Sequence, residues 1–116
     1  MKLGIVVLTT PYTFQNMDTA ISLAGAALEK GHQAMIFLYM DGVIAASNLI
    51  KPGNDRSIPL KMQSLIEKGV KITPCGVCCN YRGVRQADSQ PGIRHAGIAA
   101  LGQLVSECDR VLTLGF

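Results

Sequence analysis

Three of the four cysteines in this 116-residue sequence lie within five positions of one another: Cys75, Cys78 and Cys79. An apolar segment precedes them, and the basic residues Arg82 and Arg85 follow. A cysteine attacks other sulfur atoms as a thiolate, and nearby cations or a helix N-terminus lower its pKa. The segment therefore predicts a reactive cysteine in a positive field supplied by Lys71, Arg82 and Arg85.

The C-x-x-C spacing of Cys75 and Cys78 is compatible with a redox dithiol. In such a site Cys75 would attack a disulfide, and Cys78 would resolve the mixed intermediate. A thioredoxin-type motif, however, normally opens a long helix, and Gly76, Asn80 and Gly83 are poor residues for a helix start. The spacing alone leaves the redox interpretation open.

A zinc site would need about four ligands. Only Cys79, His95 and Cys108 remain to join the C-x-x-C pair, and no second C-x-x-C or paired histidine completes a set, so we expect no metal. Cys108 ends an apolar helical face, which favours core packing, and we expect His95 to be structural or exposed. The simplest alternative for the whole cluster is that its cysteines are buried small apolar residues.

Hydroxyl groups follow the first apolar run, at Thr10 and Tyr12 among others. Because a helix is expected to begin shortly afterwards, this segment is a candidate anion-binding turn. It has neither the G-x-G-x-x-G nor the Walker pattern, and ordinary turn and capping chemistry explains it equally well.

The composition indicates a single domain, residues 1–116, with one buried core. Apolar residues make up 48% and charged residues 16%, so part of the apolar surface is expected to lie in a subunit interface. Eleven basic residues against eight acidic ones give a formal charge of +3 without any run of like charge. This dispersed charge argues against nucleic-acid binding, which requires a concentrated basic stripe.

The apolar run at residues 3–9 is short and is followed by no small-residue cleavage site, so a strand is favoured over a signal peptide. No apolar stretch approaches the roughly 18 residues of a membrane span. We therefore expect a cytoplasmic protein without membrane contact. Thiols are kept reduced there, so clustered cysteines indicate catalysis, redox work or metal binding rather than structural disulfides.

Strand-like and helical patterns alternate along the chain. Buried strands are expected at 3–9, 34–40, 70–73 and 110–114, and helices at 16–30, 41–48, 57–69 and from Pro91 to about 105. Asn16 and Ser57 are expected N-caps, and Gly31 and Gly69 are expected helix stops. Residues 74–90 are expected to form a long loop. The alternation predicts an α/β fold, a three-layer α/β/α arrangement around a mostly parallel sheet of four to five strands. Ligands in such folds bind beyond the carboxyl ends of the strands, where the cysteines lie.

Several segments together resemble the DsrE/DsrF-like family of sulfur-relay proteins, with its TusD-like and YchN-like members. The resemblance covers most of the chain and is carried by the opening strand with 10–12, the segment 37–43, the stretch from Cys75 to Val84, and residues 108–111. In TusD-like members the active cysteine lies eight residues before the glycine of an Arg-Gly pair. Here that pair is Arg82-Gly83, and the cysteine is Cys75.

The resemblance implies that Cys75 accepts sulfane sulfur as a persulfide and passes it to a partner protein. YchN-like members also have a cysteine matching Cys78, whereas Cys79 is an addition without an assigned role. Either extra thiol could attack a persulfide on Cys75 and release sulfide. Arg82, Arg85 and backbone amides would stabilise the anionic persulfide, without a metal or organic cofactor.

The resemblance also implies partners. These are sulfur donor and acceptor proteins, together with further copies or related chains in a homotrimer, a hexamer or a hetero-oligomer. Two rivals stay open at this point. One is a thiol-disulfide oxidoreductase using Cys75 and Cys78, and the other is a non-catalytic structural subunit of a mixed oligomer. The donor, the acceptor and the pathway are not encoded in any motif that the sequence displays.

Overall fold

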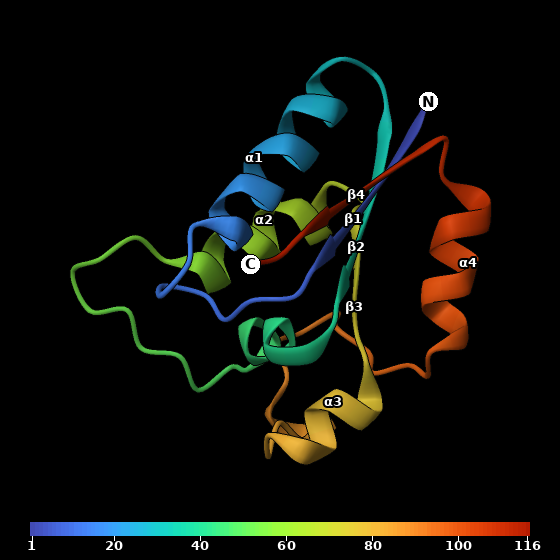
Figure 1. Cartoon of the computed structure of the whole chain (residues 1–116). Helices are drawn as coiled ribbons and strands as arrows, with labels where there is room; N and C mark the ends of the chain where they lie inside the picture. The colour runs from blue at the N-terminus through green and yellow to red at the C-terminus, as the bar shows by residue number, and fades with distance from the viewer.

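A sheet of four parallel strands forms the centre of the molecule, as predicted (Figure 1). The computed structural model describes residues 1–116. The strands are β1 (Lys2–Val7), β2 (Gln33–Leu38), β3 (Lys71–Pro74) and β4 (Arg110–Leu114). Their order in the sheet is β3-β2-β1-β4, so β3 and β4 are the two edge strands.

Helices cover both faces of this sheet, which confirms the three-layer α/β/α prediction. Figure 1 shows α1 (Asn16–Glu29) and α2 (Ile58–Glu67) on one side, and α4 (Ala99–Glu107) on the other. Two consecutive crossovers carry the chain from β1 through β2 to β3. The last connection then returns over the opposite face to β4, beside β1. The cysteine-bearing strand β3 therefore lies at an edge of the sheet.

Local capping explains where the helices begin and end. The Ser57 hydroxyl accepts a hydrogen bond from the Leu60 amide at 3.2 Å, as expected for an N-cap. Gly31 and Gly69 follow α1 and α2 with φ angles of 81° and 96°, a region that glycine enters without steric cost. Asn16 is not the N-cap that we predicted. It is the first residue of α1, and its side-chain amide donates to the Thr9 hydroxyl at 2.9 Å.

The last helix begins later than predicted. Pro91 to Ile98 is not helical, and α4 starts at Ala99. Ala96 instead pairs with the outer edge of β3: its amide donates to the Pro74 carbonyl at 3.1 Å, and its carbonyl accepts from the Gly76 amide at 2.8 Å. The backbone groups of an edge strand need partners, and this tertiary pairing outweighs the local preference of Pro91 for a helix start.

The connections around β3 contain more regular structure than predicted. The expected helix at 41–48 is a 3₁₀ helix, η1 (Met40–Ala46), and no side chain caps it. The expected loop at 74–90 contains a short helix, α3 (Gly76–Tyr81), and a second 3₁₀ turn, η2 (Gln86–Asp88). Figure 1 places α3 and η1 together beyond the carboxyl ends of the strands.

The core lies between the central strands and the helices. The last four residues of β1 and the last five of β2 are buried, and α1 packs its buried face against these strands through Met17, Ala20, Ile21 and Ala24. β4 is different, because four of its five residues are exposed. None of the helices has both the length and the apolar character that crossing a membrane requires.

Candidate active site

The three clustered cysteines lie where β3 ends and α3 begins, at the carboxyl edge of the sheet. Cys75 is the residue before α3 and has an extended backbone. Its amide donates to the Leu38 carbonyl of β2 at 2.9 Å, and its carbonyl accepts from the Cys79 amide at 3.0 Å. The backbone of Cys75 thus joins the sheet to the helix, which fixes the root of its side chain.

The Cys75 thiol is almost enclosed, with 3% of the residue exposed. It lies against the Cys78 thiol. Burial is the largest cause that raises the pKa of Cys78, and the hydrogen bond with the Cys75 side chain is the second. The amides of Val77 and Cys78, in the first turn of α3, donate to no other group of the chain. Such free amides favour a nearby anionic sulfur.

Cys78 has a hydrogen-bond donor of its own. The Met40 backbone amide donates to the Cys78 Sγ at 3.3 Å. Met40 has a φ of 51°, a left-handed conformation that costs a non-glycine residue about 1–2 kcal/mol. Burial and Cys75 raise the pKa of the Cys78 thiol, while the Met40 amide and Arg82 oppose this rise.

Cys79 has no such donor. It is fully buried, and burial followed by the charges of Cys75 and Cys78 raises its pKa to about 11. Its backbone carbonyl accepts from the amides of Arg82 and Val84, which closes the end of α3. Because Cys79 is fully buried and no donor faces its sulfur to stabilise a thiolate, it is suited to packing rather than nucleophilic attack.

Arg82 is the cation that acts on the cysteines. Its Nε donates to Asp41 Oδ1 at 2.7 Å and its Nη1 to the Cys78 carbonyl at 3.1 Å. It therefore ties α3 to η1, and its charge lowers the pKa of both Cys78 and Cys79. Asp41 offsets part of this positive charge.

The other two predicted cations do not contribute to this field. Arg85 is 75% exposed in its side chain and pairs with Asp88 at 2.7 Å. Lys71 is the first residue of β3, at the opposite end of the strand from the cysteines. The prediction that Lys71 supplies positive charge to the site is wrong. Lys71 and Cys75 are close in sequence, but an extended strand lies between them and adds about 3.3 Å per residue.

Thr10 and Tyr12 follow β1, two strands away from β3. The Tyr12 hydroxyl donates to the Arg56 carbonyl at 2.9 Å and accepts from the Ile58 amide at 3.2 Å. Tyr12 thus anchors the start of α2. The structure does not bring Thr10 or Tyr12 together with the cysteines, since β2 lies between β1 and β3.

The remaining candidates have structural partners. His95 Nε2 lies 2.7 Å from the Ser89 hydroxyl, and burial lowers its pKa. Cys108 is half-buried and packs against the core, as predicted, close to Gly4. No three metal-ligating side chains gather in a geometry that could hold a metal ion.

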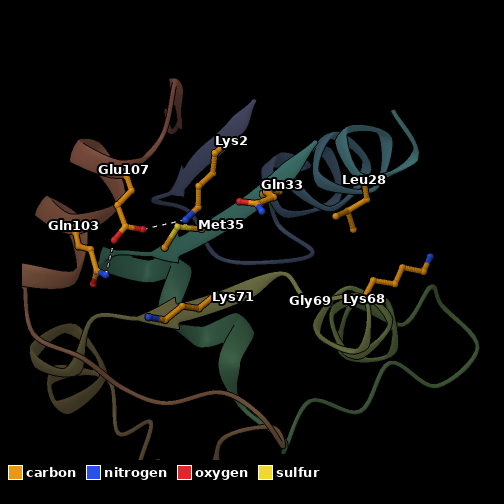
Figure 2. A pocket seen from close by; sticks show the side chains of 10 residues that line it. Lys2, Leu28, Gln33, Met35, Lys68, Gly69, Lys71, Gln103 and Glu107 are labelled. Carbon is orange, nitrogen blue, oxygen red and sulfur yellow. Dashed lines mark hydrogen bonds and ion pairs between the residues drawn. The ribbon is translucent and has the colours of Figure 1, made fainter. Parts of the chain in front are cut away.

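A hollow of about 440 Å³ lies at the amino ends of the strands and not at the cysteines (Figure 2). It is lined by Lys2, Lys71 and Gln33 among others. Figure 2 shows Lys2 and Gln103 both directed at Glu107: Lys2 Nζ lies 3.0 Å from one carboxylate oxygen, and Gln103 Nε2 lies 2.7 Å from the other. Seven of the ten residues that line this hollow are not hydrophobic, and the side chains of its ion pair, Lys2 and Glu107, are partly exposed.

Met40 and Asp41 are the site residues that the sequence prediction missed. Both directly follow β2, at one of the strand ends where ligands of α/β folds bind. The rule that neighbouring parallel strands end at the same edge would have placed them beside Cys75 if the pairing of β2 with β3 had been known.

Comparisons with known proteins agree with this geometry. A model of the DsrE/DsrF-like family matches residues 1–114. An uncharacterized protein of Methanocaldococcus jannaschii is 30% identical, with 97% of this chain and 99% of that protein covered. The sulfurtransferase TusD of Klebsiella pneumoniae is 32% identical, with 97% and 98% covered. Among solved structures, the ychN protein from E. coli superposes with a TM-score of 0.90 at 27% identity, covering 98% of this chain and 99% of that chain.

Proposed function

The chain belongs to the DsrE/DsrF-like family, and on that basis we propose that it is a sulfur-relay protein in which Cys75 accepts sulfane sulfur as a persulfide and passes it to a partner protein. The relatives named sulfurtransferase TusD support the relay role. The observation that carries the assignment to Cys75 is its position at the carboxyl end of β3, against a second thiol and before the free amides of α3.

The proposed reaction needs a thiolate and then a place for a negative sulfur. The Cys75 thiolate attacks the outer sulfur of a donor persulfide, and the donor leaves as a thiolate. The sulfur that Cys75 gains carries the negative charge. The amides of Val77 and Cys78 and the Arg82 guanidinium are the groups suited to stabilise it. An acceptor thiolate then removes the same sulfur by a second attack.

Burial of Cys75 requires that the site open for a protein partner. α3 has only six residues and is followed by the turn at Gly83, with a φ of 67°. Short segments of this kind open locally at low cost compared with the core. We propose that the partner displaces α3, in which Val77 near the start and Tyr81 at the end expose 54% and 81% of their surface. Between transfers, the closed site would keep the persulfide away from dissolved thiols.

We also propose that the protein works in the cytoplasm as an oligomer of identical or related chains, with a trimer or a hexamer expected. The exposed edge strand β4 and the outer side of α4 support this. Val105 of α4 and Val111 and Leu112 of β4 are exposed apolar side chains, as is Ile98 directly before α4. An unpaired, apolar edge strand is a surface that proteins normally cover. Light scattering during size-exclusion chromatography tests the prediction, and a monomer at micromolar concentration would contradict it.

Intact mass spectrometry tests the persulfide. The protein is incubated with inorganic polysulfide without oxygen, freed of reagent and weighed. Wild type is expected to gain a sulfur atom and Cys75→Ser to gain none. Cys108→Ser is the matched control, because it removes a free cysteine distant from the site, and it should behave as wild type. Wild type that stays unmodified by a competent donor would refute the proposal.

A second function remains a candidate because the Cys75 and Cys78 thiols are adjacent. A thiol-disulfide oxidoreductase would form a reversible internal disulfide with a defined redox potential and would need no sulfane sulfur. A structural subunit of a mixed oligomer, by contrast, would leave sulfur transfer by the assembled complex intact in Cys75→Ser. Equilibration in glutathione buffers, followed by thiol trapping, separates the oxidoreductase from the relay protein.

A further inference from the structure

Two thiols lie close to Cys75, and the structure gives them different surroundings. Cys78 has an external hydrogen-bond donor, the Met40 amide at 3.3 Å, whereas Cys79 has none. Cys78 also retains 8% exposure, and Cys79 is completely enclosed. A sulfur that must carry a negative charge during a reaction needs such a donor, so only Cys78 is equipped for attack.

The direction of the Met40 amide is set by the packing of the chain after β2. The Tyr39 amide donates to the Val7 carbonyl at 3.0 Å, and the Gly42 amide donates to the Tyr39 carbonyl at 2.9 Å. Gly42 lies so close to the backbone of Val7 that an added Cβ would collide with it. These contacts hold Met40 in its left-handed conformation, with its amide directed at the Cys78 sulfur. Backbone strain that the surroundings maintain is frequently found at functional sites.

We propose that Cys78 is a resolving thiol: it attacks a persulfide on Cys75, forms a Cys75–Cys78 disulfide and releases hydrosulfide. The inference rests on the proposed function, because it requires a persulfide on Cys75. It adds a second activity, reduction of sulfane sulfur to sulfide, which takes place when no acceptor protein collects the sulfur. Cys79 takes no part in it.

The step balances without any group from outside. Cys78 passes its proton to the outer sulfur of the Cys75 persulfide, and the resulting thiolate accepts the Met40 hydrogen bond. That thiolate attacks Cys75 Sγ, the bond between Cys75 Sγ and the outer sulfur breaks, and HS⁻ leaves. The outer sulfur gains two electrons, and the two cysteine sulfurs are oxidised to a disulfide. An external dithiol must then reduce this disulfide before another turnover.

The raised pKa of Cys78 suits this sequence. Burial and the neighbouring Cys75 keep the Cys78 proton in place until a sulfur atom is ready to receive it. The amide donor and Arg82 then stabilise the thiolate that remains. For Cys79, the same transfer would leave an enclosed thiolate without a donor, which is unfavourable in an apolar environment.

Single-turnover sulfide release tests the proposal. Wild type, Cys75→Ser, Cys78→Ser, Cys79→Ser and Cys108→Ser are loaded with inorganic polysulfide, desalted without reductant and sampled over time. Trapping with bromobimane measures sulfide, and intact mass measures the added sulfur and the disulfide. Wild type should lose its added sulfur, release about one sulfide per chain and become a disulfide. Cys79→Ser and Cys108→Ser should match wild type within about twofold, and Cys78→Ser should keep its added sulfur at least tenfold longer.

The outcomes separate this inference from the proposed function. If neither wild type nor Cys78→Ser gains sulfur, and wild type forms no disulfide and releases no sulfide, the relay function fails and the resolving step fails with it. If Cys78→Ser takes up sulfur and releases sulfide as fast as wild type, only the resolving role of Cys78 is overturned. If Cys79→Ser loses sulfide release and Cys78→Ser keeps it, Cys79 is the resolving thiol and the proposal for Cys78 is also overturned.

Discussion

Replacement of Arg82 by methionine should weaken both the fold and the thiol site, because Arg82 is the side chain that ties α3 to η1. Methionine keeps the aliphatic part of the side chain and removes all its donors. Two interactions are lost: the ion pair with Asp41 at 2.7 Å and the hydrogen bond to the Cys78 carbonyl at 3.1 Å.

The expected magnitude follows from how exposed these groups are. The side chains of Arg82 and Asp41 are 25% and 51% exposed, so solvent screens their ion pair to about 0.5–1 kcal/mol. The hydrogen bond to the carbonyl adds about 1 kcal/mol. Arg82→Met should therefore lower the free energy of unfolding by about 1.5–2 kcal/mol. For a chain of 116 residues that corresponds to a fall in Tm of about 6–8 °C.

A double-mutant cycle isolates the ion pair. Arg82→Met, Asp41→Asn and the double variant are unfolded in urea, and the coupling energy between the two residues should be about 0.5–1 kcal/mol. Arg85 and Asp88 form a matched control pair, with the same 2.7 Å separation but a more exposed arginine. The hydrogen bond to Arg85 lowers the pKa of Asp88, but the arginine is 75% exposed, so the coupling in their cycle should be smaller than that of Arg82 and Asp41.

The same variant should slow the chemistry. Arg82 lowers the pKa of Cys78, so its removal raises that pKa and reduces the thiolate available at neutral pH. Sulfide release from the loaded protein should become several-fold slower. If Arg82→Met leaves both the unfolding free energy and the release rate unchanged, or if the Arg82–Asp41 coupling equals that of the control pair, our account of Arg82 is refuted.

Three further predictions concern single sites. Cys79 has a pKa of about 11 against an ordinary 9.0, so it should hold about 100-fold less thiolate at neutral pH than an ordinary cysteine. Iodoacetamide should therefore modify Cys79 last of the four cysteines in the native protein, and as fast as the others in urea. Gly42→Ala forces its new Cβ into the backbone of β1 and should destabilise the protein by about 1–3 kcal/mol. Gly25→Ala, on the open side of α1, should stabilise it by about 0.5–1 kcal/mol. Equal urea midpoints for the two variants would contradict this. Arg56 holds the pKa of Asp18 below 3.8, so the extra stability of wild type over Asp18→Asn should be constant above about pH 5 and disappear as the pH falls below 3.8; a difference that persists at pH 2 would exclude this linkage.

The position of the site could be predicted from local patterns. Apolar runs with strand character alternate with helical spacing, and this alone indicates parallel strands whose carboxyl ends share one edge. The cysteine stretch follows β3 directly, so it had to lie at that edge. Ser57, Gly31 and Gly69 were assigned correctly because capping depends on neighbouring residues in the chain.

Burial and partners could not be predicted in this way. Pro91 favours a helix start, but β3 is an edge strand and Ala96 pairs with it, so α4 begins at Ala99. Arg85 and Arg82 look equivalent in sequence, but only Arg82 reaches Asp41 and the Cys78 carbonyl. These differences arise from residues that lie tens of positions apart.

By itself, the sequence determined the type of fold and the edge of the sheet at which the clustered cysteines lie. Only the tertiary structure decided that Cys78 receives the Met40 amide, that Cys79 is sealed without a donor and that Lys71 is remote. The physical reason is that periodicity and capping report the local conformation and which side of an element is buried. The reactivity of a sulfur atom depends on the atoms packed around it, and those come from strands whose order the local pattern does not encode.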